Sequence, residues 1–177
     1  NPLTMNKDLL VNGFRIILLV LFQVLILKEI NLDNTSTHYI SIIIYQLGII
    51  LLPVDLPSFI VLLISFVCGI IVDSFYGSPG VHSSACLWMA ASRPFVLKFL
   101  EPKSGYSINQ KPTPSSLGIF WFLRFASILT FIYLFAYFTM EVFTFVYFGK
   151  ILLKTIVSFT VSMVVIFLIQ ILINPKE

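Results

Sequence analysis

Residues 58–72 read SFIVLLISFVCGIIV, an apolar run without a charged side chain. Comparable apolar runs recur along the whole chain, and about 20 apolar residues can cross a hydrocarbon core of about 30 Å as a helix. Of the 177 residues, 58% are hydrophobic and 11% are charged, whereas a typical soluble domain has about 25% charged residues. A water-soluble fold cannot bury that much apolar surface. The sequence therefore predicts an integral membrane protein.

The apolar segments predict an all-α integral membrane protein, a six-transmembrane-helix bundle that forms one domain over residues 1–177. Pro53 and Pro57 follow the second segment and predict a tight reversal. The fourth segment is expected to kink or end near Pro94. A helix over 117–147 would be about 46 Å long, so it must tilt, protrude or break near Glu141. The predicted spans are residues 9–27, 39–52, 58–72, 81–100, 117–139 and 151–173.

The distribution of cations predicts the orientation. Six crossings place both termini on one side of the membrane, and cytoplasmic loops carry an excess of Lys and Arg. The 11 Lys and Arg divide eight to three between the two sets of span ends, so both termini and the loop 101–116 are expected in the cytoplasm. The net charge of +3 includes no basic run, which gives no support for nucleic-acid binding. The cytoplasmic set is Lys7, Arg15, Arg93, Lys98, Lys103, Lys111, Arg124 and Lys176; the other set is Lys28, Lys150 and Lys154.

Polar residues and glycines are densest over 69–84. Asp73 lies one helical turn after Gly69 on the same face, and a glycine there lets a neighbouring helix approach closely. The Asp73 carboxylate could accept hydrogen bonds from amides of the 77–80 turn or of the next helix start. Ser78-Pro79 has the form of an N-cap followed by proline at the first helical position. We favour a structural role for Asp73 over a catalytic or ion-binding one.

Gly77 and Gly80 bracket this short turn. We expect Gly80 to adopt a backbone conformation, or to permit a close approach, that a branched side chain would block. Nearby, His82 could pair with Asp73 or Glu141, and the plainer alternative is a histidine at the membrane interface.

Arg93 precedes Pro94 near the predicted cytoplasmic end of the fourth span. Its side chain either extends to the lipid headgroups or binds carbonyls that Pro94 leaves without a partner. The sequence reasoning does not separate these alternatives.

Signatures of catalysis and of metal binding are missing from the sequence. There is no GxSxG, HExxH or phosphate-binding glycine loop. Cys68 and Cys86 lie in apolar stretches without CxxC spacing, and His38, the second histidine, lies on a different loop from His82. Zinc would need further ligands. The sequence predicts no enzyme, no cofactor and no metal.

Residues 52–97 resemble the rod shape-determining protein MreD family, particularly its Bacteroidetes-type members. The order and spacing of several short motifs carry the resemblance, while the last two spans match only in hydrophobicity and in Glu141. The motifs are Leu-Leu-Pro-Val-Asp-Leu-Pro from Leu51, Ser65-Phe66, Gly69, Asp73-Ser74-Phe75, Gly80-Val81-His82 and Arg93-Pro94-Phe95.

The resemblance implies a non-enzymatic membrane scaffold or activator of the bacterial cell-elongation machinery, which makes side-wall peptidoglycan and maintains rod shape. It implies a location in the bacterial cytoplasmic (inner) membrane, among membrane lipids. The implied partners are the bitopic protein MreC, the elongation glycosyltransferase and transpeptidase complex and, indirectly, the MreB filament. The candidate partner contacts are Asp73, His82 and Glu141.

An alternative is a small-molecule-binding membrane subunit of a transporter, of the vitamin-uptake substrate-capture type. Such subunits share the six-helix architecture and dock through small-residue helix faces. Within the first span, residues 14–27 contain no Ala, Gly or Ser, which argues against docking of that kind.

Overall fold

The computed structural model describes residues 2–28, 41–108, 110–143 and 147–173, with the backbone alone described for 2–10 and 171–173. All regular elements in these ranges are helices. The long helices are α1 (Pro2–Phe22), α4 (Ser58–Tyr76), α5 (Val81–Phe99), α7 (Ile119–Val142) and α8 (Phe148–Ile173). The short ones are the π-helix η1 (Gln23–Leu27), α3 (Gln46–Ile50) and α6 (Pro114–Leu117).

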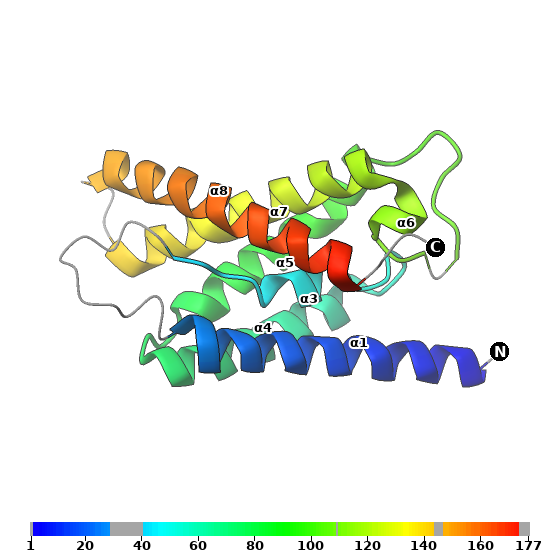
Figure 1. Ribbon diagram of the computed structural model, residues 1–177, viewed down its shortest axis with the longest axis horizontal. Coiled ribbons are helices and arrows are strands. Elements are labelled where there is room, and N and C mark those ends of the chain that lie inside the picture. The colour runs from blue at the N-terminus through cyan, green and yellow to red at the C-terminus, as the bar shows by residue number, and fades with distance from the viewer. Residues whose placement is uncertain (1, 29–40, 109, 144–146, 174–177) are drawn as a thin grey trace.

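The long helices run along the long axis of the molecule (Figure 1). Helix α4 packs on α5, α5 on α7, and α7 on α8, while α1 contacts α3. The start of α1 and the end of α8 point toward the same end of the molecule, where the loop between α5 and α7 also lies (Figure 1). The turn between α4 and α5 lies at the opposite end.

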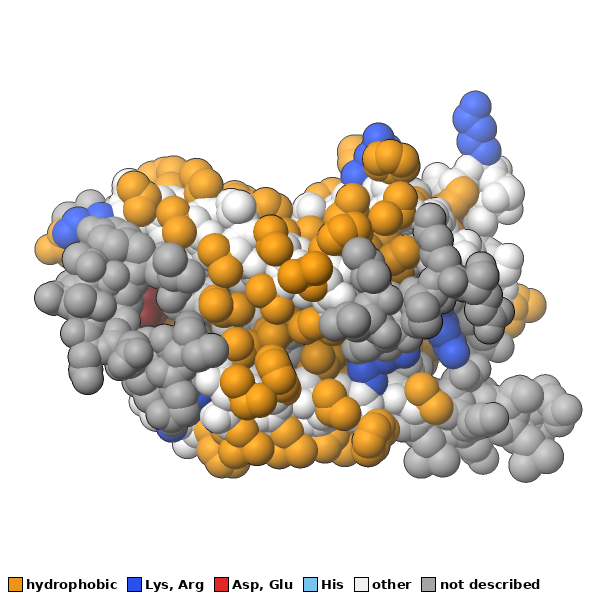
Figure 2. All heavy atoms as spheres, viewed as in Figure 1, with side chains coloured by type: hydrophobic (Ala, Val, Ile, Leu, Met, Phe, Trp, Pro, Cys, Tyr) orange, Lys and Arg blue, Asp and Glu red, His pale blue; other side chains and the backbone are white. Residues whose placement is uncertain are grey.

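The outer surface is apolar enough for a bilayer. Among the described residues, α4, α7 and residues 148–170 of α8 are long and apolar enough to cross a membrane, and Val11–Leu27 is a shorter apolar helix. Figure 2 shows hydrophobic side chains over the middle of the visible face, with Lys and Arg toward the two ends. In the described ranges the chain is therefore an all-helical membrane protein, which confirms that part of the sequence prediction.

The sequence predicted that the second span is a helix over residues 39–52, and this prediction is wrong. Residues 39 and 40 lie outside the described residues, 41–44 have no helical hydrogen bonding, and only Gln46–Ile50 is α-helical. Ile42, Ile43 and Ile44 are β-branched residues that suit extended backbone. Residues 43–53 are nonetheless all buried, so this non-helical stretch lies inside the bundle.

Three helix ends refine the other expectations. Helix α5 continues through Pro94 to Phe99, so it does not end at the proline. It begins at Val81 with Gly80 as the N-cap, so the predicted Ser78-Pro79 cap is wrong. Helix α7 ends at Val142, and Phe143 adopts a left-handed conformation with φ 50°. Of the alternatives for the fifth apolar stretch, the break near Glu141 is the one found.

Candidate functional site

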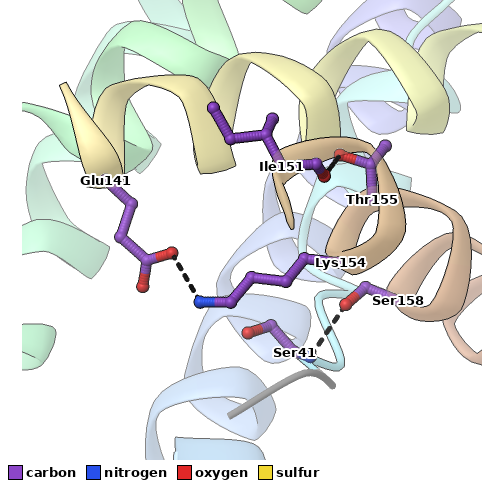
Figure 3. A network of polar contacts seen from close by, with 6 residues as sticks. All are labelled: Ser41, Glu141, Ile151, Lys154, Thr155 and Ser158. Carbon is purple, nitrogen blue, oxygen red and sulfur yellow. Dashed lines mark hydrogen bonds and ion pairs between the residues drawn. The ribbon is translucent and has the colours of Figure 1, made fainter. Parts of the chain in front are cut away.

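The extended segment 41–44 is half-buried at Ser41 and Ile42 and buried at Ile43 and Ile44. It obtains hydrogen-bond partners from side chains of other elements. Gln23 accepts from the Ile44 N–H through Oε1 at 2.9 Å, and its Nε2 donates to the Ile42 carbonyl at 3.1 Å. From α8, Ser158 Oγ accepts from the Ser41 N–H at 3.0 Å (Figure 3), and Ser162 Oγ accepts from the Ile43 N–H at 3.3 Å. Non-helical backbone at membrane depth persists only where protein satisfies it. These side chains therefore explain how the segment is held.

Gln23 is the first residue of the π-helix η1 and is fully buried. Its Nε2 also donates to Tyr76 Oη at 2.8 Å, so one amide joins η1, the extended segment and α4. A π-helical turn changes the direction of its side chains relative to those of the preceding α-helix. Such turns are often found at functional positions. We call Gln23, Ser158 and Ser162 the amide clamp.

Asp73 organises the turn between α4 and α5. Its Oδ1 accepts from the His82 N–H at 2.8 Å and from Ser78 Oγ at 3.3 Å. Its Oδ2 accepts from the Gly80 N–H at 3.1 Å, the Ser83 N–H at 3.0 Å and Ser83 Oγ at 2.8 Å. An anion at a helix N-terminus is favourable because the unpaired amides and the dipole attract it. These are the bonds to the turn and to the next helix that the sequence predicted.

The glycines around this turn act differently from one another. A Cβ on Gly69 would lie 2.8 Å from the Ser83 nitrogen and closer still to the Ser83 Cα, so Gly69 permits close approach of α4 and α5, as predicted. Gly77 and Gly80 have positive φ values of 65° and 91°, which favour glycine. No atom lies within 4 Å of a Cβ placed on Gly80, so backbone conformation, rather than close packing, explains that glycine.

A cluster of tyrosines surrounds His82 in the interior of the bundle, near the start of α5. His82 Nδ1 lies 2.8 Å from Tyr133 Oη and 3.4 Å from Tyr45 Oη, and the two hydroxyls are 2.8 Å apart. The Tyr45 hydroxyl is also 3.2 Å from Cys86 Sγ. The rings of Tyr76 and Tyr137 lie 4.9 Å and 4.8 Å from the His82 ring.

The sequence reasoning missed this cluster. Tyr45, His82 and Tyr133 are completely buried, so His82 is neither at the interface nor paired through its ring with Asp73 or Glu141. The available signal was the presence of tyrosines in otherwise apolar segments, because a buried hydroxyl needs a partner. The partners come from distant spans, and periodicity does not reveal them.

Arg93 lies inside the bundle and is 3% exposed. It donates to the carbonyls of Leu52 and Pro53, the latter at 3.1 Å, just after α3 ends. Both expected roles are therefore wrong: the side chain does not extend to the headgroups, and the carbonyls that it binds belong to the reversal at 51–57. A guanidinium supplies several donors in one plane, which suits two successive carbonyls.

Glu141 contacts a different residue from those that Asp73 and His82 contact. Its carboxylate forms an ion pair of 3.6 Å with Lys154 and joins the end of α7 to α8 (Figure 3). Asp73 and His82 are buried, whereas the Glu141 side chain is 41% exposed. Of the three candidate partner contacts, only Glu141 is therefore open to a partner without rearrangement.

Two apolar grooves lie on the outside of the bundle. One lies between α1 and α4 and encloses about 380 Å³; the other is formed by Trp88 of α5 with residues of α7 and encloses about 350 Å³. Cys68 and Cys86 are free thiols. Within the described ranges no three His, Cys, Asp or Glu residues gather in a way that could hold a metal ion.

No family model, no curated protein and no solved structure matches this chain. The fold and the site define a helical membrane protein whose buried polar side chains largely bond its own backbone and one another. The resemblance of residues 52–97 to the MreD family stays a prediction.

Proposed function

We propose that this chain is a non-enzymatic membrane scaffold of the machinery that builds side-wall peptidoglycan in the bacterial cytoplasmic (inner) membrane. In this proposal it works with a bitopic MreC-like protein and maintains rod shape. The proposed topology has six crossings with both termini in the cytoplasm, and the segment 41–52 makes the second crossing in place of a transmembrane helix.

The proposal rests on one observation: buried polar side chains form hydrogen bonds to the protein's own backbone. Both oxygens of Asp73 accept hydrogen bonds from the following turn and helix, and Arg93 binds two backbone carbonyls. Catalytic carboxylates need an acceptor position open to substrate, and an ion path needs polar groups that are not already committed. The polar residues described here support a role in fixing the shape of the bundle.

Exposed apolar helix surface supports association within the bilayer. Phe59, Leu63, Phe66 and Ile70 are all exposed along one face of α4. Helices associate in lipid through close packing and a few polar contacts. At the end of α7, exposed Glu141 and Phe143 offer a polar and an aromatic contact.

Depletion of the protein in its native bacterium tests the function. Loss of a scaffold of side-wall synthesis should turn rods into round cells, and a plasmid copy should restore the rods. Normal shape combined with reduced uptake of a vitamin or metal would overturn the scaffold proposal and favour the transporter subunit.

A photo-crosslinking residue in place of Phe143 tests the partner. We expect it to capture a protein with one membrane span and an extracytoplasmic coiled coil, since Phe143 is 86% exposed at the proposed outer end. The matched control is the same residue in place of Ile108, which is 90% exposed in the loop at the opposite end. Equal capture at both positions would contradict an outer contact.

A further inference from the structure

The Arg93 guanidinium is a buried positive charge without a counter-ion among the described residues. Arg93 is 3% exposed, and its Nη2 donates to the carbonyls of Leu52 and Pro53. Its Nε is also buried and has no hydrogen-bond partner within the described ranges. A buried donor needs an acceptor, and a buried charge is costly unless an opposite charge lies nearby. Two neutral carbonyls supply acceptors but no negative charge.

A small cavity lies beside Arg93, between α4, α5 and the reversal at 51–57. It encloses about 30 Å³, and Arg93 is one of the residues that line it. Ala90 also lines it, one turn before Arg93 on the same face of α5. Side chains on a helix lean toward its N-terminus, so the short side chain of Ala90 leaves space beside the guanidinium. Val61 and Leu97 close the cavity with buried aliphatic side chains.

The first turn of α4 brings further donors to the same cavity. Helix α4 begins at Ser58, and its N-cap, Pro57, makes no side-chain hydrogen bond to it. The backbone N–H groups of Ser58 and Phe59 have no partner among the described residues, and the first turn contains no acidic residue. A helix N-terminus attracts anions through its unpaired amides and its dipole. Because Ser58 lines the cavity together with Arg93, the helix end and the guanidinium act on one small volume.

The size and charge of the cavity identify its occupant. A cavity of about 30 Å³ has room for one or two water molecules, but water would leave the Arg93 charge without a counter-ion. A phosphate group, with four oxygens around its centre, does not fit whole. A chloride ion is only slightly larger than water and accepts several N–H donors at once. Lys98, exposed one turn after Pro94, adds positive potential at this end of α5.

We propose that the cavity beside Arg93 binds one monovalent anion of the size of chloride, with Arg93 Nε and the Ser58 N–H as donors. The anion would be reached from the surface past Ser58 and Pro94, which line the cavity and are exposed. A bound anion joins α4, α5 and the carbonyls of the reversal through one guanidinium. The site goes beyond the proposed scaffold function and does not depend on it.

The test is binding of radioactive chloride to the purified full chain in detergent, with sodium gluconate keeping the ionic strength constant. We expect saturable binding of about one chloride per chain, which unlabelled bromide displaces and phosphate does not. Chloride at about 100 times its Kd should also raise the Tm by about 5 °C or more relative to gluconate. A folded wild-type protein without saturable chloride binding would overturn the proposal. So would displacement by phosphate as readily as by bromide, which would indicate an oxyanion such as a lipid headgroup.

A substitution that supplies the negative charge makes the result independent of folding defects. Ser58→Asp places a carboxylate at the first turn of α4 beside the guanidinium, where it should raise the Tm in gluconate and weaken chloride binding at least tenfold. Ser116→Asp, the same change at an exposed serine of α6, should leave chloride binding unchanged. Ala90→Val fills the cavity without a change in charge and should also weaken binding at least tenfold. Equal chloride affinity in the wild type and in Ser58→Asp would overturn the proposal.

Discussion

A methyl group added at Gly69 would meet the backbone of Ser83, which cannot move without shifting α5 as a whole. We expect Gly69→Ala to destabilise the protein by about 1–3 kcal/mol, the usual cost of overpacking. The measurement is thermal unfolding of the purified protein in detergent. Gly149→Ala is the matched control, because no atom lies within 4 Å of a Cβ at that position. Equal effects of the two changes would contradict close packing at Gly69.

Replacements of Asp73 separate hydrogen bonding from charge. Asp73→Leu leaves the N–H groups of Gly80, His82 and Ser83 without their acceptor, at a cost of about 1–3 kcal/mol for each buried donor. Asp73→Asn keeps one acceptor oxygen, so its loss of stability should be smaller. Thermal unfolding ranks the three proteins, with the order Asp, Asn, Leu expected. If Asn and Leu lost function equally while both stayed folded, a negative charge would be required.

At the scale of the secondary-structure elements, the amide clamp determines whether residues 41–44 stay ordered. Gln23→Leu removes partners of the Ile44 N–H and the Ile42 carbonyl together. Hydrogen exchange of the 41–45 amides should therefore become faster by a factor that corresponds to about 2 kcal/mol or more. Ser162→Ala removes one bond to the same segment and should have a smaller effect.

A control on the same helix tests whether the effect is local to the clamp. Thr160 of α8 is exposed, and its hydroxyl donates to the Ile156 carbonyl within its own helix. Thr160→Ala should leave exchange at 41–45 unchanged. Faster exchange in this control would assign the effect to α8 in general.

How far the sequence could predict each element depended on how near its hydrogen-bond partners lie along the chain. The Asp73 turn was predictable because its partners lie within 10 residues of the carboxylate. The helical spans were predictable because a helix satisfies its own backbone. The segment 41–44 was not, because Ser158 and Ser162 lie 117 and 119 residues from the amides they bind. Tyr45 and Tyr133, 88 residues apart, show the same difficulty.

At the scale of the whole molecule, cysteine labelling tests the proposed orientation. Cys68 and Cys86 are buried, so they should react little with a membrane-impermeant thiol reagent. We expect Gly149→Cys to be labelled from outside intact cells, because Gly149 is exposed at the end of the bundle proposed to face outward. Ser107→Cys, exposed in the loop at the other end, should be labelled only after the membrane is opened. The reverse pattern would invert the topology.

The dependence of residues 41–44 on α8 has a consequence for biosynthesis. The segment leaves the ribosome long before Ser158 and Ser162 exist, and 117 residues separate the first of these pairs. At about 5–20 residues per second that delay is roughly 6–23 s. A nascent chain that has inserted α1 and α4 must therefore shelter the Ser41 and Ile43 amides, with the insertion machinery or a chaperone as the temporary partner. A chain truncated before α8 should remain in this immature state and be a preferred substrate of membrane proteases.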